Sequence, residues 1–370
     1  MDRRKFVSAL GLGAATAALA ACGKQDCETG AAAGTDQKVY KWKMVTTWPK
    51  NYPGLGTSPE KFANLVRQMS GGRIDIKVFG ANEMVPALEV FDAVSQGSAE
   101  LGHGAAYYWK GKHPAAPFFT AVPFGFTAQE QNGWLHHGGG QQLWDELYAR
   151  FNLKPFACGN TGTQLPGWYN KEINSIKDLA GLKIRMPGLA GEVLQRLGAS
   201  TVNLPGGEIF TSLESGVIDA ADWVGPYNDL TFGFHKIAKF YYYPGWHEPG
   251  PTLELILNKE AWDGLPEDLQ AIITAATAWA NDDMLSEYTA RNSAALKELR
   301  DKHGVQVRRL PDDVLVALKE QSDKVLDELT ANDELARRVY ESYRSFATSV
   351  QAMSSIGETE YLRIRETLAK

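Results

Sequence analysis

The 370-residue sequence is poor in cysteine and has no long apolar run after its first 22 residues. Its three cysteines, Cys22, Cys27 and Cys158, are too few for a disulfide framework. A single bridge between Cys27 and Cys158 stays open, although two unpaired thiols are favoured because Cys27 lies in a segment expected to be mobile. Acidic residues outnumber basic ones by 44 to 38, so nucleic acid is not an expected partner.

Sequence motifs of common enzymes are also missing. The sequence contains no GxSxG, no phosphate-binding GxxxxGK[ST], no HExxH and no CxxC. His247 and Glu248 form half of a zinc motif, but no second histidine follows at the required spacing. His136 and His137 are adjacent, and neighbouring positions on a helix point apart. A catalytic zinc site is therefore not expected.

The N-terminal segment has the pattern of an export signal. Residues 1–22 contain the pair Arg3-Arg4, a weakly apolar stretch that is too short to span a membrane, and Leu-Ala-Ala before Cys22. The arginine pair resembles a twin-arginine signal, and Cys22 resembles a lipoprotein box. We expect a periplasmic protein with a lipid on Cys22; simple cleavage near Ala20 or Ala21 is the alternative.

The rest of the chain predicts an α/β fold that begins near Val39. The segment 23–38 is small, polar and aperiodic, as in a flexible tether. Apolar periodicity then alternates between strand and helix, which predicts a parallel or mixed sheet covered by helices. The expected elements are strands at 39–48, 74–78 and 99–105, and helices from Ser58 to Gly71 and at 87–96.

One unit of this pattern occurs twice. Residues 89–100 and 208–219 share an acid, a branched residue, a phenylalanine, a glycine and a final acid at matching places. In each, an amphipathic helix should end at a left-handed glycine, Gly97 or Gly216, before a strand. Two α/β lobes follow from this echo. Because ligands bind beyond the carboxyl ends of strands in open α/β sheets, segments 102–109 and 221–228 should face one cleft.

The third part of the sequence is helical. Patterns over 267–300, 312–329 and 333–353 predict three helices, the first far longer than the usual mean of about 11 to 12 residues. Such a helix would form a spine across both lobes or a dimer contact.

Candidate ligand-binding residues lie at turns and strand ends. Asp222 and Glu248 stand among tryptophans, where a carboxylate is costly to bury without a cation or donor. With the amide of Gln164 and a main-chain carbonyl, they would suit a hard cation such as Na⁺ or Ca²⁺. Arg185 ends a predicted strand, so it is either a surface charge or a planar fork for a ligand carboxylate. The aromatic run 240–243 is better explained by strand packing.

Three of these segments resemble a known family. KDLAGLKIRMPG, GGEIFTSLESGVIDAADWVGP and YYYPGWHEPG are similar to sequences of the solute-binding proteins of tripartite ATP-independent periplasmic (TRAP) transporters, and the likeness covers nearly all of Val39–Lys370. It implies a two-lobed, class II-like periplasmic binding protein with a hinge, a long spanning helix and a helical C-terminus. Lobe I would comprise 39–160 and about 252–310, lobe II 161–251, and 311–370 would pack across the lobes or in a dimer.

The second and third segments resemble the branch of this family that binds 2-oxo or 2-hydroxy acids with a metal ion. That resemblance implies that Arg185 binds the ligand carboxylate, and that Gln164, Asp222, the carbonyl of Trp223 and Glu248 hold the cation. Asp222 stands where the resemblance leads us to expect Glu, which leaves Na⁺ or Ca²⁺ open. Tyr107 or Tyr108, with Trp223, would exclude water.

The expected function is a receptor, not an enzyme, that delivers a small monocarboxylate to a membrane permease. A homodimer through the long helices is a further expectation. Two alternatives stay open. One is an exported oxidoreductase or lyase, because twin-arginine signals are often found on cofactor-loaded proteins. The other is a receptor of the same fold for a dicarboxylate or a sugar acid.

Overall fold

The computed structural model describes residues 38–369, and Val39–Lys370 is one compact unit. The predicted signal, Cys22 and nearly all of the predicted tether lie outside the described residues. Among the described residues, no helix has the length and apolar character needed to cross a membrane.

The first sheet has five strands in the order β2-β1-β3-β10-β4. β1 is parallel to β2 and β3, whereas β10 runs antiparallel to β3 and β4. In β2 the residues Ile74, Ile76 and Val78 are buried and alternate with exposed ones, as their spacing predicts. The strands are β1 (Tyr40–Thr46), β2 (Ile74–Phe79), β3 (Leu101–Gly104), β4 (Leu153–Asn160) and β10 (Thr252–Asn258).

The second sheet has six strands in the order β11-β9-β5-β8-β6-β7. β6 is parallel to β7 and β8, and β5 is antiparallel to β8 and β9. The aromatic run Phe240–Tyr243 is strand β9, as expected. The other strands are β5 (Trp168–Tyr169), β6 (Lys183–Arg185), β7 (Ser200–Val202), β8 (Ala220–Ala221) and β11 (Gln306–Arg309).

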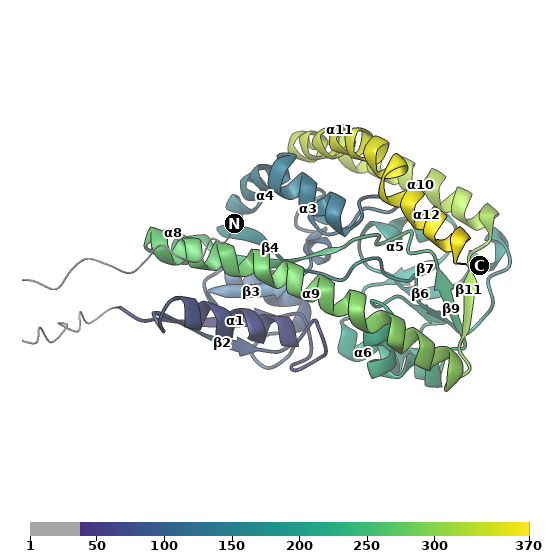
Figure 1. Ribbon diagram of the computed structural model, residues 1–370, viewed down its shortest axis with the longest axis horizontal. Helices are drawn as coiled ribbons and strands as arrows, with labels where there is room; N and C mark the ends of the chain where they lie inside the picture. The colour runs from purple at the N-terminus through teal and green to yellow at the C-terminus, as the bar shows by residue number, and fades with distance from the viewer. Residues whose placement is uncertain (1–37, 370) are drawn as a thin grey trace, which may run out of the picture. The chain divides into compact units, whose positions relative to one another are not determined.

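Helices connect the strands of both sheets (Figure 1). They are α1 (Thr57–Met69), α2 (Val90–Ser95), α3 (Ala128–His137), α4 (Gly140–Ala149), α5 (Gly188–Arg196), α6 (Gly206–Glu214), α7 (Pro226–Phe232) and α8 (Lys259–Asp263). Short 3₁₀ turns are η1 (Ala87–Glu89), η2 (Ala106–Trp109), η3 (Ala116–Phe119), η4 (Ile176–Leu179) and η5 (Phe234–Lys236).

The repeated unit found in the sequence is present in both sheets. α2 is followed by Gly97 with φ of 75° and then by β3, and α6 is followed by Gly216 with φ of 73° and then by β8. Both glycines are in the left-handed region, which residues with a Cβ adopt only at a cost. Each unit therefore ends in a short buried strand. This strand is β3 in the first sheet and β8 in the second.

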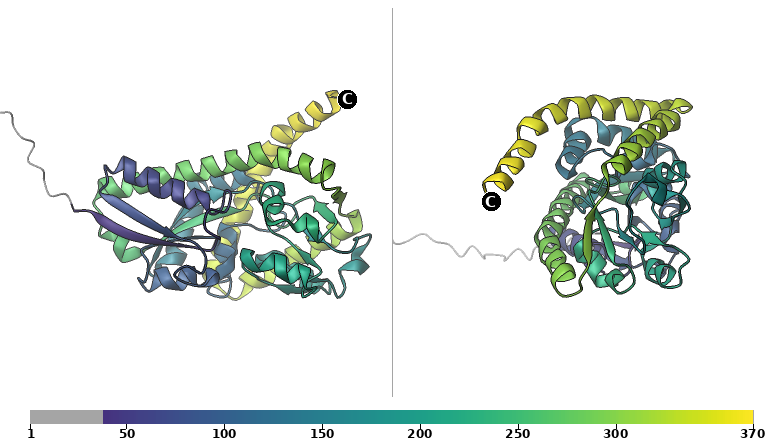
Figure 2. Two further views of the ribbon diagram at one scale, coloured as in Figure 1. Left: turned by 90° about the horizontal axis from the view of Figure 1, so that it is seen from below. Right: turned by 90° about the vertical axis from the view of Figure 1, so that its right-hand side faces the viewer.

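The chain passes between the two sheets three times. It leaves the first sheet after β4, returns after β9, and crosses again along α9 (Glu267–Asp301). α9 contacts α1 and β4 at the first sheet and α7 beside the second, and Figures 1 and 2 show it running along both. The predicted long spanning helix is thus confirmed.

The boundary expected near residue 310 for the first lobe is wrong for one strand. β11 pairs in parallel with β9 and so belongs to the second sheet. The reason is the length of α9, whose 35 residues at about 1.5 Å each carry the chain roughly 50 Å. The few residues between Asp301 and Gln306 cannot return it to the first sheet.

Two C-terminal helices, α10 (Asp312–Ala331) and α11 (Glu334–Ile356), pack on helices attached to the two sheets. α10 contacts α5, whereas α11 contacts α3 and α4. The ring of Tyr343 on α11 lies 3.9 Å, centroid to centroid, from that of Phe126. A final helix that the sequence analysis missed, α12 (Glu358–Leu368), buries none of its residues and extends away from the sheets in Figure 2.

Candidate ligand and cation site

The carboxyl ends of strands from the two sheets meet at one cleft. Tyr107 and Tyr108 lie in η2, just after β3, and Trp223 lies just after β8. Trp48, which follows β1, bridges them, since its ring is 6.2 Å from Tyr108 and 6.3 Å from Trp223. A cavity of about 280 Å³ lies beside this contact. Tyr107 and Tyr108 of η2 line one side of it and Met186 and its neighbours line the other, whereas Arg185, Trp223 and the predicted cation ligands do not line it. Segments 102–109 and 221–228 therefore both contact Trp48, and only the first of them lines the cavity.

Arg185 is fully buried and is not a surface charge. It is the last residue of β6, between β7 and β8, so its side chain leaves the sheet at the carboxyl edge. Its Nε donates to the carbonyl of Leu204 at 3.2 Å, and its Nη1 donates to the carbonyl and Oδ2 of Asp222 at 2.8 and 3.0 Å. Nη2 has a weaker contact, 3.4 Å to the hydroxyl of Tyr108. One guanidinium nitrogen, Nη2, therefore keeps donor capacity.

Asp222 is held on both of its carboxylate oxygens. While Oδ2 accepts from Arg185, Oδ1 lies 2.9 Å from Nε2 of His247. The residue is fully buried, and its own main-chain N–H donates to the carbonyl of Arg185 at 3.0 Å. A buried carboxylate needs such partners, because desolvation strongly disfavours an isolated charge.

Gln164 and Glu248 come from two loops that contact through their main chains. The N–H of Gln164 donates to the carbonyl of Glu248 at 3.1 Å. A Cβ on Gly245 would lie 1.9 Å from the carbonyl oxygen of Gln164, so this approach requires glycine. Both side chains are buried, yet Oε1 of Gln164 and Oε2 of Glu248 have no hydrogen-bond partner among residues 38–369. Unpartnered buried oxygens are costly and need an explanation such as an ion.

Burial raises the pKa of Glu248 well above its ordinary value, and the neighbouring carboxylate of Asp222 raises it further, while Arg185 lowers it. Asp222, His247 and Glu248 each place one potential ligand atom within 4.8 Å of those of the other two, and all three residues are buried. Two carboxylates and an amide oxygen are ligands that Na⁺ and Ca²⁺ prefer. The residues present therefore fit the cation expected from the sequence.

The loop that carries Trp223 is fixed by a buried carboxylate on α7. Asp229 accepts from the main-chain N–H groups of Val224 and Gly225 at 3.3 and 3.1 Å. Its second oxygen accepts from Trp168 Nε1 at 2.9 Å and from the Tyr241 hydroxyl at 2.7 Å. Burial raises the pKa of Asp229 to about 7, and the bonds from Tyr241 and Trp168 oppose this. The Asp229 carboxylate thus accepts four hydrogen bonds, two of them from the backbone after β8.

The structure brings together all the residues predicted for the site and adds three that the sequence analysis missed as site residues. His247 contacts Asp222, and Trp48 and Tyr52 follow β1 into the same cleft. Trp48 is itself fixed, because its Nε1 donates to His103 Nδ1 at 2.9 Å. Burial lowers the pKa of His103 to about 4, so it accepts this bond as a neutral ring. Applying the strand-end rule to β1 would have identified both aromatic residues.

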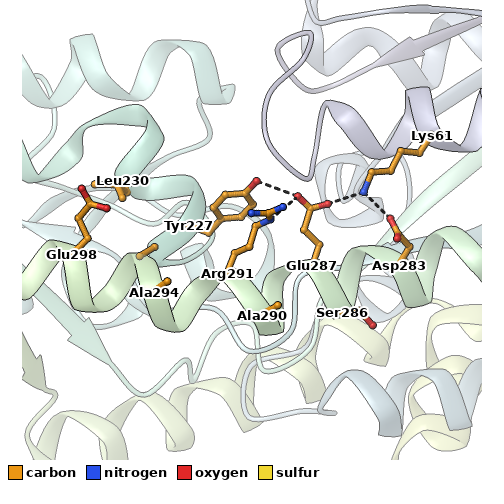
Figure 3. A pocket seen from close by; sticks show the side chains of 11 residues that line it. Lys61, Tyr227, Leu230, Asp283, Ser286, Glu287, Ala290, Arg291, Ala294 and Glu298 are labelled. Atoms are coloured by element: carbon orange, nitrogen blue, oxygen red, sulfur yellow. Dashed lines mark hydrogen bonds and ion pairs between the residues drawn. The ribbon is translucent and has the colours of Figure 1, made fainter.

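A second cavity, of about 700 Å³, lies along α9 and contains none of these residues (Figure 3). Its charges pair with one another: Glu287 binds Lys61 at 2.8 Å and accepts from the Tyr227 hydroxyl at 3.1 Å, and Lys61 also binds Asp283. Arg291 lies 3.4 Å from Glu287. Because these cations already have acidic partners, we do not place the anionic ligand here.

Comparison with known proteins agrees with this geometry. Residues 44–333 match the family model described as bacterial extracellular solute-binding protein, family 7. The chain belongs to this family. A family 7 relative, the monocarboxylate 2-oxoacid-binding periplasmic protein of Nostoc sp., is 43% identical over 363 residues, which cover 98% of each chain. The TRAP family resemblance inferred from the sequence is therefore confirmed.

Solved structures of TRAP periplasmic solute-binding proteins are similar to most of this chain. A TRAP periplasmic solute-binding protein from Pseudoalteromonas atlantica, with bound sodium and pyruvate, has a TM-score of 0.86 and 43% identity and covers 88% of this chain and 99% of its own. A protein from Colwellia psychrerythraea, with bound calcium and pyruvate, gives the same values. The two-sheet fold with a long helix is thus the fold of this family.

Proposed function

We propose that this family 7 receptor binds a small 2-oxo or 2-hydroxy monocarboxylate, of the pyruvate, 2-oxobutyrate or lactate type, together with Na⁺ or Ca²⁺. The observation that carries the proposal is one buried cluster: a guanidinium with a free donor beside two carboxylates and two unpartnered buried oxygens. The ligands named for the similar proteins from Nostoc, Pseudoalteromonas and Colwellia support the same assignment.

In this proposal Arg185 binds the ligand carboxylate through Nη2, because Nε and Nη1 are already committed to carbonyls and to Asp222. Gln164, Asp222, Glu248 and the carbonyl of Trp223 hold the cation, which when bound attracts the ligand's carboxylate and C2 oxygens. Tyr107, Tyr108 and Trp223 cover the ligand and exclude water, which strengthens each of these electrostatic contacts.

The aromatic wall favours a ligand with a short side chain. The Trp48 ring lies 6.2 Å from that of Tyr108 and 6.3 Å from that of Trp223, centroid to centroid. A dicarboxylate would need a second free cation, and Lys110 at the cavity wall already pairs with Glu192 at 3.1 Å. We therefore favour a monocarboxylate over the dicarboxylate alternative.

We further propose a receptor role without chemical conversion of the ligand, in the periplasm, with delivery to the membrane permease of a TRAP transporter. The two parts of the chain built on the two sheets would close on the ligand as lobes, with the three crossing segments as the hinge. Lipid on Cys22 would hold the receptor near the permease. An exported oxidoreductase or lyase remains the alternative of a different class.

A homodimer through the C-terminal helices is part of this proposal. Several apolar side chains near the end of the chain are exposed, most of them on α12, which buries nothing. The exposed side chains are Met353, Ile356, Tyr361, Leu362, Ile364 and Leu368. Monomeric proteins rarely leave such a group of side chains uncovered.

Calorimetry on the purified protein tests the ligand assignment. Pyruvate should bind in the presence of Ca²⁺ or Na⁺, bind much more weakly after chelation of Ca²⁺ in Na⁺-free buffer, and compete with lactate. Mass spectrometry of the ligand released from gently purified protein should show a monocarboxylate, with no conversion on incubation. Binding of succinate in preference to pyruvate, or turnover of the bound acid, would overturn the proposal.

A further inference from the structure

Tyr52 links the two sides of the cleft through its hydroxyl. The residue lies in the loop after β1, on the side of the first sheet, and is 6% exposed. Its hydroxyl donates to the carbonyl of Asn228 on α7 at 2.6 Å and accepts from Trp223 Nε1 at 3.3 Å. A single phenol oxygen therefore contacts both the indole proposed to cover the ligand and the helix that follows it.

The partner of Tyr52 on α7 is itself fixed from two other segments. Oδ1 of Asn228 accepts from the hydroxyl of Tyr288, on the middle of α9, at 2.5 Å. Its Nδ2 donates to the carbonyl of Pro53, the neighbour of Tyr52, at 2.8 Å. Asn228 and Tyr288 are fully buried. We call these residues, Tyr52, Pro53, Trp223, Asn228 and Tyr288, the Tyr52 clasp.

Aromatic packing orients the same residues. The Tyr52 ring stacks on Phe232 at 4.4 Å and meets the Trp223 ring edge-on at 6.3 Å. Burial raises the pKa of Tyr52 and of Tyr288 well above the ordinary value, so both hydroxyls stay protonated and can donate. Since the polar side-chain atoms of the clasp are paired, separating its two sides would expose several donors and acceptors at once.

We propose that Tyr52 is a positioning residue of the ligand site: by binding the Trp223 indole and α7 from the opposite side of the cleft, it holds the cleft closed over the ligand. The inference rests on the proposed function, because Trp223 is assigned there to the ligand and the cation. The loss of the Tyr52 hydroxyl shifts the balance toward the open state, from which ligand leaves. Affinity falls mainly through faster dissociation.

The test compares Tyr52→Phe with Tyr242→Phe. Tyr242 is equally buried, but its hydroxyl accepts from the N–H of Ile173 at 2.6 Å within the second-sheet side alone. In stopped-flow measurements with pyruvate and Ca²⁺, Tyr52→Phe should release ligand about tenfold faster, the equivalent of one hydrogen bond. Tyr242→Phe should lower the thermal midpoint without changing release. Tyr288→Phe should also speed ligand release, though by less than Tyr52→Phe. It replaces Tyr52→Phe in the test if that variant does not fold.

Small-angle X-ray scattering separates failure of this inference from failure of the proposed function. If the wild type binds no pyruvate, the proposed function fails, and the clasp is judged on ligand-free protein: its radius of gyration should increase in Tyr52→Phe and not in Tyr242→Phe. Release rates and scattering curves that match the wild type, with only a lowered thermal midpoint, would show that Tyr52 is structural and would overturn the inference.

Discussion

Replacing Arg185 with Met should remove ligand binding while preserving cation binding. Met fills similar volume but leaves the carbonyl of Leu204 and one oxygen of Asp222 without donors. Breaking a buried ion pair by removing one partner costs about 3 to 5 kcal/mol of stability. The ligand carboxylate would lose its charged partner, which costs about 2 to 5 kcal/mol or roughly 30- to 4000-fold in affinity.

The same substitution should not weaken Ca²⁺ binding. Arg185 is the cation nearest to the paired acids Asp222 and Glu248, and it lowers the pKa of Glu248. Without it, Ca²⁺ meets less repulsion, so its affinity in the absence of ligand should be unchanged or higher. Calorimetry with pyruvate at saturating Ca²⁺ and with Ca²⁺ alone measures the two effects separately, and urea unfolding confirms that the variant is folded.

Two variants control this experiment. Arg196→Met removes an arginine whose partner, Glu328, is on the surface, and it should change neither affinity. Arg185→Lys keeps the charge, but one nitrogen cannot reach Leu204, Asp222 and the ligand together, so binding should remain weak. A pyruvate affinity within threefold of the wild type in Arg185→Met would refute the assigned role.

Three further predictions concern the cation, the charge of its site and pH. Chelation of Ca²⁺ should lower the thermal midpoint of the wild-type protein. The thermal midpoint of the Glu248→Gln variant should fall by less, and differential scanning calorimetry measures both changes. Asp222→Asn should weaken Ca²⁺ more than Na⁺ because affinity for the divalent ion depends on carboxylate number; equal losses in titrations would contradict this. Burial raises the pKa of Glu254 to about 7, from an ordinary 4.5, so the folded state binds the extra proton and stability should fall by about 3 kcal/mol between pH 4.5 and 7. In urea unfolding Glu254→Gln, which keeps an acceptor for Trp109, should lack this part of the pH dependence; identical pH profiles would contradict the assignment.

Much of the fold could be predicted because its periodicities are local. Short stretches of sequence are enough to predict three features. These are the alternating residues of β2, the left-handed glycines after α2 and α6, and the length of α9. The position of β11 was not predictable in this way. Its sheet is decided by where α9 ends in space, and four residues of strand pattern carry no such information.

The charged part of the site could be predicted because buried acids and a strand-end arginine are unusual. The contacts that hold it could not. His247 was recognised only as an incomplete zinc motif, yet its function here is decided by its distance of 2.9 Å from Asp222. Tyr52 and Asn228 are 176 positions apart, and a tyrosine or asparagine alone predicts no partner. Long-range pairing of neutral side chains leaves no periodic signal in the sequence.

The continuity of α9 limits how far the cleft can open. The helix contains neither glycine nor proline over its 35 residues, so it lacks the usual positions at which helices kink. If its curvature stays within radii of about 60 to 100 Å, a helix of roughly 50 Å bends through about 30° to 50° from end to end. The helix then behaves as an elastic beam with a bounded deflection. Wider opening would break backbone hydrogen bonds of α9. The stiffness of this one helix therefore limits how far the cleft opens to admit the ligand.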